Sequence, residues 1–293
     1  MYARLAKVDN NWYFLQVMHT ARKDSGPQSR ARATLAAFID RLQMEGRYDF
    51  TRTEAAAFLH SSATALKRSI SRLAAKGRLL ALRRGFYVIV PIEYAASGGP
   101  PASWYIDDLM KFLDRPYYVG LLSAAALHGA AHRQVQELQV VTAVPLRPIQ
   151  SGRARIRFFM KDRIGLTHTK PSQTETGTMA VATAEATSFD VVRYASRLGG
   201  VSVAATVLAE LSEVIDPKSL VAAAKREGEL SVVQRTGYLL AKVGRRPLTR
   251  ALEAWLARKA TRPVPLRAER GAKREHRDAV WNIVVNEEIE VDE

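Results

Sequence analysis

The sequence predicts an α+β protein of two units, a helical unit with a β-hairpin followed by a mixed α/β unit that ends in a helical bundle. Between residues 30 and 96, three stretches of helical periodicity precede two short apolar runs joined by a glycine. A stretch rich in glycine and proline follows at 97–103. Beyond it, β-branched runs give way at residue 183 to helical patterns separated by Gly or Pro.

The composition suits two globular units without cysteine chemistry. Hydrophobic residues make up 47% of the 293 residues, and compact domains usually span roughly 100 to 200 residues. The absence of cysteine excludes disulfides, thiolate zinc sites, iron–sulfur clusters and a cysteine nucleophile, and favours a reducing cytoplasm. Charges interrupt the apolar run of residues 1–19, so neither a signal peptide nor a membrane span is expected there.

A basic arm at 1–29 and then an amphipathic helix are expected at the start of the chain. Residues 20–32 mix Gly, Pro and Ser with cations, which is typical of a solvated segment. The helix is predicted to run for about 15 residues and to end near Gly46. Its apolar residues share one face: Leu35, Phe38, Ile39 and Leu42.

Two further helices are predicted between residues 51 and 77. Thr51 and Glu54 form a capping-box pattern that begins a short helix ending at Leu59. A turn leads to a third helix, which has a narrow apolar stripe and a natural stop at Gly77. The stripe consists of Leu66, Ile70 and Leu73.

Two strands with a cationic turn follow the third helix. The runs at 78–82 and 86–90 are apolar, and Gly85 can adopt the positive φ of a tight turn. Helix, short helix, turn, helix and hairpin is the order of a winged helix-turn-helix, which we predict at 30–96. In that fold the third helix lies in the major groove of DNA, and the hairpin, or wing, reaches the flanking phosphates.

The third helix contains most of the residues expected to contact DNA. Seven cations and no carboxylate occur between residues 61 and 85, whereas a solvated helix face usually mixes both signs. The net charge is +9 for residues 1–98 and +6 for the remaining two thirds of the chain. Arg68 and Arg72 are the expected guanine contacts. The predicted DNA-binding residues are Thr64, Lys67, Arg68, Ser71 and Arg72 on the helix, with Arg83 and Arg84 on the wing.

The second unit is predicted to span 103–293. Its last apolar run is expected to form a strand anchored by Trp281, Ile283 and Val285, followed by an acidic end that either is solvated or covers a basic surface. Strands are expected at 138–144, 154–161 and 178–182, and helices at 104–113 and 120–130 and in five stretches after 183.

No catalytic or metal site is predicted. His128 and His132 have the spacing of helical metal ligands, but Gly129 stands where a zinc hydrolase has its glutamate base. Asp107 and Asp108 are adjacent on a helix and diverge by about 100°, so at most one can face a given site. No nucleotide-binding or serine-hydrolase motif occurs. The protein is therefore expected to have no cofactor, no bound metal and no enzymatic activity.

Arginines alternate with apolar residues around the strand expected at 154–161. Arg153, Arg155 and Arg157 should line one face of it. Two interpretations stay open: a partner surface for an acidic protein or an RNA backbone, or an ordinary edge strand whose cations discourage unwanted pairing.

Five sequence blocks stand in a distinctive order along the chain. They are RRGFYVIVP at 83–91, YYVGLLSAAALHGAAH at 117–132, VATAEATSFDVVRY at 181–194, QRTGYLLAKVG at 234–244 and WNIVVNEEIEVD at 281–292. Together they resemble the AbiEi family of antitoxins from type IV toxin–antitoxin and phage-defence systems. The resemblance implies a winged helix that represses its own operon and a C-terminal antitoxin domain that counteracts a nucleotidyltransferase-like toxin without a stable protein complex.

The sequence thus favours a cytoplasmic autorepressor and antitoxin that is not associated with a membrane. Its expected partner is double-stranded DNA, an inverted repeat in its own promoter. One alternative is a one-component regulator whose second domain binds a small effector. Another is a nucleic-acid-processing enzyme that uses the arginine row and Asp107 or Asp108.

Overall fold

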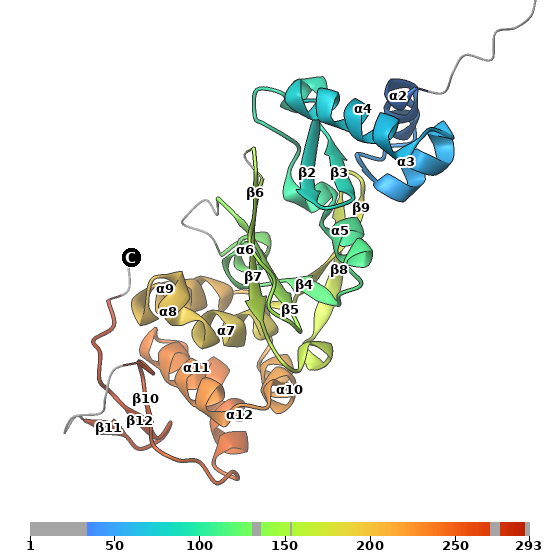
Figure 1. Ribbon diagram of the computed structural model, residues 1–293. Helices are drawn as coiled ribbons and strands as arrows, with labels where there is room; N and C mark the ends of the chain where they lie inside the picture. Colours follow the sequence, from blue (N-terminus) through green and yellow to red (C-terminus); the bar gives the residue numbers. More distant parts are fainter. Residues whose placement is uncertain (1–33, 131–135, 153, 270–275, 291–293) are drawn as a thin grey trace, which may run out of the picture.

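The computed structural model describes residues 34–130, 136–152, 154–269 and 276–290. Figure 1 shows three parts along the molecule: the N-terminal helices with a small sheet, a larger sheet, and a helical bundle. Within the described ranges, no helix is long and apolar enough to cross a membrane. The arm predicted at 1–29 lies outside these ranges.

The N-terminal part contains helices α2 (Leu35–Met44), α3 (Arg52–Leu59) and α4 (Ala63–Ala75). The predicted capping box is confirmed, since Thr51 Oγ1 accepts from the Glu54 amide and the Glu54 carboxylate accepts from the Thr51 amide at 2.6 Å. Ser62 caps α4 in a similar way through the Ala65 amide. α2 is shorter than predicted, because it ends at Met44.

A three-stranded antiparallel sheet of order β1-β3-β2 packs beside these helices. Its strands are β1 (Asp49–Thr51), β2 (Leu79–Arg83) and β3 (Phe86–Ile89). The predicted hairpin is confirmed, and Gly85 in its turn has a φ of 93°. β1 was not predicted, because three residues are too few to show a strand periodicity.

The hairpin contributes side chains to two hydrophobic cores. Leu79 and Ile89 pack with the apolar residues of α2, α3 and α4. Leu82, Phe86 and Val88 pack with residues of the second unit instead. Alternate residues of a strand point to opposite faces, so both faces of this small sheet are covered.

The Gly- and Pro-rich stretch predicted as the domain boundary is packed against its surroundings. The Trp104 ring centre lies 4.8 Å from that of Tyr48 and 5.1 Å from that of Tyr94. Gly99 has a φ of 141°, and a Cβ at this position would lie 2.6 Å from Leu80 Cδ1. The stretch therefore joins the two units through a close contact with β2.

A mixed six-stranded sheet forms the middle of the molecule, with strand order β6-β7-β5-β4-β9-β8. β5 pairs parallel with β7, and β4 pairs parallel with β9 and antiparallel with β5. The three predicted strands correspond to β5, β7 and β9, whereas β4, β6 and β8 were not predicted. The strands are β4 (Tyr117–Val119), β5 (Leu138–Thr142), β6 (Ile149–Ser151), β7 (Ala154–Met160), β8 (Thr169–Thr174) and β9 (Gly177–Ala182).

Helices cover this sheet and continue into the bundle (Figure 1). The first of the five helical stretches expected after 183, at 185–198, is interrupted at Tyr194 and forms two helices, α7 and α8. The helices are α5 (Ile106–Phe112), α6 (Leu121–Leu127), α7 (Ala184–Arg193), α8 (Ala195–Leu198), α9 (Val201–Leu211), α10 (Pro217–Glu227), α11 (Leu230–Lys242) and α12 (Arg246–Leu256).

The C-terminal strand anchors on the bundle, as the sequence predicts. Trp281 and Ile283 are buried, and Trp281 lies directly on Gly237 of α11, where a Cβ would overlap the indole ring. The acidic end makes its own contact, since Glu287 pairs with Arg267 at 2.8 Å. The strands here are β10 (Val264–Pro265), β11 (Arg277–Asp278) and β12 (Ile283–Val284).

Candidate nucleic-acid interface

Helix α4 has an apolar side in the core and a polar side in solvent. Leu66 and Ile70 are buried among the N-terminal helices. The structure brings the residues predicted on this helix together on its exposed side: Thr64, Lys67, Arg68, Ser71 and Arg72.

Among the described residues, no carboxylate neutralises the cations on the exposed side of α4. In the described part of the chain, no carboxylate lies within ion-pair distance of Lys67, Arg68 or Arg72, and the Arg72 guanidinium donates only to Ser69 Oγ at 3.3 Å. The first turn of α4 contains no acidic residue. This face therefore carries positive charge that is available to an anionic partner.

The single carboxylate of α3, Glu54, has partners other than the α4 cations. Glu54 accepts from the Thr51 amide and from Arg47 Nη2, which lies 3.0 Å away. Burial alone would raise the pKa of Glu54, but these donors outweigh burial and lower the pKa. Glu54 thus serves the helix cap and Arg47, not the cations of α4.

The two arginines of the hairpin turn have different surroundings. Arg83 is half-buried, donates to the backbone carbonyl of Arg147, and lies 5.9 Å from the Phe158 ring centre. Burial lowers its pKa. Arg84 is exposed. Arg83 therefore fastens the hairpin to the second unit, whereas Arg84, the other arginine predicted to contact DNA from the wing, is exposed.

The arginine row does not lie on an edge strand. In the strand order β7 lies between β6 and β5, which contradicts the edge-strand interpretation for the strand as a whole. Each arginine is paired on one side only, because Arg155 lies opposite Gln150 of β6 and Arg157 opposite Gln139 of β5. Arg157 is half-buried, 3.4 Å from the Glu137 carboxylate and 5.3 Å from the Phe159 ring centre. Arg155 is exposed, and Arg153 lies outside the described residues.

The polar residues considered for catalysis have structural contacts. His128 Nε2 lies 2.7 Å from a backbone carbonyl of β9, and His132 falls outside the described ranges. Asp107 and Asp108 share Lys111, at 2.6 and 3.5 Å. Within the residues that the structure describes, no group of three His, Cys, Asp or Glu side chains could hold a metal ion.

A buried ion cluster beside the sheet was missed by the sequence analysis. Lys161 Nζ lies 2.8 Å from both Asp190 Oδ1 and Glu227 Oε2, Tyr118 donates to Asp190, and Arg193 pairs with Glu227. Burial lowers the pKa of Lys161, but the two carboxylates outweigh burial and raise it, so the ammonium stays charged. These residues are far apart in the sequence, and no local pattern marks them as partners.

Asp49 is a buried carboxylate at the junction between the two units. Burial and the nearby charge of Asp108 raise its pKa to about 7, against the opposing effect of Arg47. The closest Arg47 nitrogen is 4.0 Å from the Asp49 carboxylate, which is too far for a good hydrogen bond.

Two family models match separate stretches of the chain. The family model described as a transcriptional regulator, AbiEi antitoxin, matches residues 38–90, and that of the AbiEi antitoxin C-terminal domain matches 118–242. No match was found among curated proteins.

A solved structure is also similar over most of the chain. The crystal structure of the RV2827C protein from Mycobacterium tuberculosis superposes with a TM-score of 0.58 at 14% identity, covering 85% of this chain and 89% of that chain. At this identity the similarity concerns the fold alone. The two family matches lie in the order expected for one antitoxin and regulator, and the chain belongs to the AbiEi antitoxin family.

Proposed function

We propose that the protein is a DNA-binding autorepressor and antitoxin whose first unit works as a winged helix-turn-helix. The observation that supports this most directly is the exposed face of α4, where three cations have no carboxylate partner among the described residues. A solvated helix without a ligand gains nothing from such a one-signed face, whereas the phosphates of DNA complement it. The regulator family match at 38–90 supports the same function.

In this proposal α4 enters the major groove of an inverted repeat in the protein's own promoter. Arg68 and Arg72 reach guanine edges, while Thr64, Lys67 and Ser71 meet neighbouring bases or phosphates. Arg84 meets a flanking phosphate. Arg83 instead keeps the hairpin on the second unit through the Arg147 carbonyl.

The second unit is proposed to counteract a nucleotidyltransferase-like toxin from the same operon, without catalysis and without a stable complex. The antitoxin family match at 118–242 supports this role. Because the promoter is its target, the protein acts in the cytoplasm. Arg155 remains a candidate residue for a partner surface, since its guanidinium is exposed.

Promoter binding tests the proposal. Fluorescence anisotropy with the upstream inverted repeat should show an affinity that falls by at least about tenfold for the double variant Arg68→Ala and Arg72→Ala. Arg84→Ala, which removes the proposed phosphate contact, should instead weaken binding to all sequences alike and flatten the slope of log affinity against log salt concentration by about one unit. A matched control is Lys170→Ala with Lys218→Ala, which removes two exposed cations outside α4 and should bind nearly as the unaltered protein does.

A separate assay tests the antitoxin role. Co-expression with the neighbouring toxin gene should restore growth for both the unaltered protein and the α4 double variant, because the α4 face belongs to the first unit. Loss of promoter binding with rescue intact would separate the two roles. Equal promoter affinity for the α4 variant and its control would refute the DNA-binding assignment.

A further inference from the structure

A cavity lies where the segment joining the two units meets the large sheet. Its volume is about 740 Å³, within the range of known small-molecule sites. One wall is formed by residues 97–103, and the others by α6 and the strands β5, β7 and β9. Cavities between domains are frequent ligand sites, because a ligand there touches both parts.

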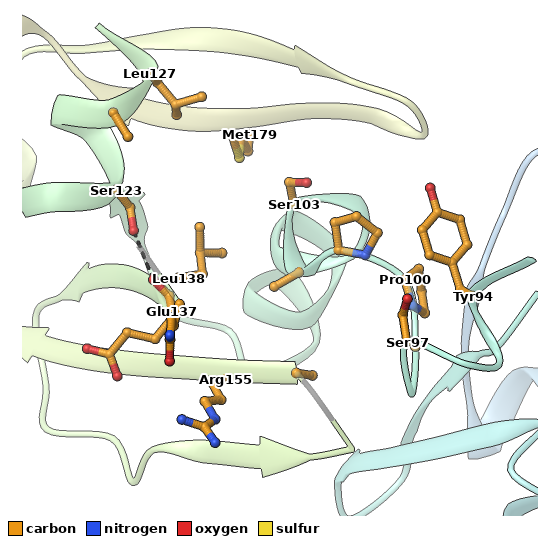
Figure 2. A pocket seen from close by; sticks show the side chains of 16 residues that line it. Tyr94, Ser97, Pro100, Ser103, Ser123, Leu127, Glu137, Leu138, Arg155 and Met179 are labelled. Atoms are coloured by element: carbon orange, nitrogen blue, oxygen red, sulfur yellow. Dashed lines mark hydrogen bonds between the residues drawn. The ribbon is translucent and has the colours of Figure 1, made fainter. Parts of the chain in front are cut away.

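The centre of the cavity is apolar. Figure 2 shows Leu127, Leu138 and Met179 directed toward one space, with Ser103 beside them. Leu127 is 51% exposed, which is unusual for a leucine on a wall of a concave site and leaves apolar surface without cover. An apolar molecule would remove this surface from water.

The charged residues of the cavity lie at its margin. In Figure 2 the Arg155 side chain is directed away from Ser103 and Met179. The Glu137 carboxylate already accepts from Arg157 and Gln139, each at 3.4 Å. The apolar centre therefore offers no free ionic partner among the described residues, and a charged ligand placed there would lose its hydration without compensation.

Hydroxyl groups supply the polar part of the site. Ser103 is half-buried, and its hydroxyl has no hydrogen-bond partner among the described residues. The Tyr94 hydroxyl also has no such partner in the described ranges. Both lie on the side formed by the joining segment, so they can bind a polar group at one end of a ligand.

We propose that this cavity binds an uncharged small molecule with an apolar ring and one hydrogen-bonding group, and that the ligand adjusts the affinity of the first unit for DNA. The regulatory half of this proposal rests on the proposed function. The ring packs against Leu127, Leu138 and Met179, and the polar group bonds to Ser103.

The packing of the joining segment explains how a ligand would affect DNA binding. Gly99, in the cavity wall, lies directly on Leu80 of β2. Tyr94, also in the wall, packs on Trp104, which in turn packs on Tyr48 ahead of β1. A ligand that moves or stiffens this segment thus acts on the sheet that supports α4.

A pair of matched probes tests binding with the full-length protein in the absence of DNA. Isothermal titration calorimetry at neutral pH should show 2-naphthol binding at one site, and 2-naphthoate binding at least about tenfold more weakly because its carboxylate would be desolvated. No heat with 2-naphthol up to its solubility limit would overturn the proposal. Tighter binding of 2-naphthoate would overturn the claim that the ligand is uncharged.

Variants locate the site. Leu127→Arg places a charge on the cavity wall and should abolish 2-naphthol binding, whereas Val214→Arg, at a similarly exposed apolar residue (54% against 51%), should leave binding unchanged. Ser103→Ala should weaken binding about threefold to tenfold, because one hydrogen bond to the probe is removed. Equal binding by Leu127→Arg and Val214→Arg, with circular dichroism showing both folded, would place the probe elsewhere and refute the site.

Promoter binding is then measured with and without saturating 2-naphthol. We expect the dissociation constant for DNA to change at least threefold in the unaltered protein and not to change in Leu127→Arg. Probe binding without this change would refute the regulatory half alone. If the protein binds no promoter DNA at all, the proposed function fails, while calorimetry still decides whether the cavity binds the probe.

Discussion

The cations of α4 and the cation of Lys161 show two uses of charge in one chain. Lys67 and Arg68 are exposed and have no carboxylate beside them in the described part of the chain, whereas Lys161 is buried between Asp190 and Glu227. Water solvates an exposed cation, so the fold depends little on it, but a buried cation leaves its partners uncompensated when it is removed. The α4 cations are therefore available for an external partner, while Lys161 maintains the second unit.

Replacing Lys161 by methionine should have the largest effect on the free energy of unfolding among the substitutions considered. Lys161→Met leaves Asp190 buried without its cation and leaves Glu227 with Arg193 alone, which costs about 3–5 kcal/mol of unfolding free energy. Urea unfolding followed by circular dichroism measures the loss. The control Arg68→Met, on the exposed face of α4, should stay within about 0.5 kcal/mol of the unaltered protein. A loss below about 1 kcal/mol for Lys161→Met would mean that the cluster is not needed for folding.

Asp49 is an intermediate case, because it is buried and its neighbouring cation, Arg47, is 4.0 Å away, too far for a good hydrogen bond. Its pKa in the folded protein is about 7, above the ordinary 3.8, so the folded state holds the proton more tightly than the unfolded chain. The stabilisation is complete below about pH 4 and is lost as the pH rises through 7.

The difference in unfolding free energy between pH 5 and pH 8 should therefore include about 2–3 kcal/mol from Asp49. Asp49→Asn, which cannot ionise, should remove this part of the pH dependence. Unfolding measured at several pH values checks the prediction, with Asp40→Asn on the exposed side of α2 as the control. Identical pH profiles for the unaltered protein and Asp49→Asn would contradict it.

The two neighbouring arginines of the hairpin show the same contrast between a structural cation and an exposed one. Arg83→Ala removes the bond to the Arg147 carbonyl and the packing on Phe158, so it should lower the unfolding free energy by about 1–2 kcal/mol. Arg84→Ala should leave stability unchanged and weaken promoter binding. Thermal unfolding and anisotropy measure the two effects, and a reversed pattern would show that the two assignments are exchanged.

The smallest expected effect concerns the capping box of α3. Thr51→Ala removes the hydroxyl that accepts from the Glu54 amide and should cost about 1 kcal/mol. Thr51→Ser keeps this bond and should cost less. Chemical denaturation of both variants measures the difference, and equal losses would show that the hydroxyl does not contribute.

Local patterns predicted much of the first unit. The capping box, the stripe of Leu66 and Ile70, and the turn at Gly85 were all predicted correctly, because each depends on residues within a few positions of one another. The short strand β1 was not predicted. Three residues have no measurable periodicity, and their pairing with β3 joins distant parts of the chain.

The arginine row shows where local patterns fail. Alternation correctly placed Arg155 and Arg157 on a strand, but it cannot show what lies beside that strand. β6, a strand of three residues that shows no pattern of its own, pairs with residues 154–156 of β7. The position of a strand in a sheet is decided by pairing between segments, which the sequence of the strand alone does not contain.

The helices of the first unit, the hairpin and the cationic face of α4 follow from local sequence, because periodicity, capping and charge act over a few residues. Three features depend on the folded arrangement: the bond of Arg83 to the second unit, the contacts of Lys161 with Asp190 and Glu227, and the cavity beside the joining segment. These features bring together residues that are distant in the chain, and their partners are set by packing.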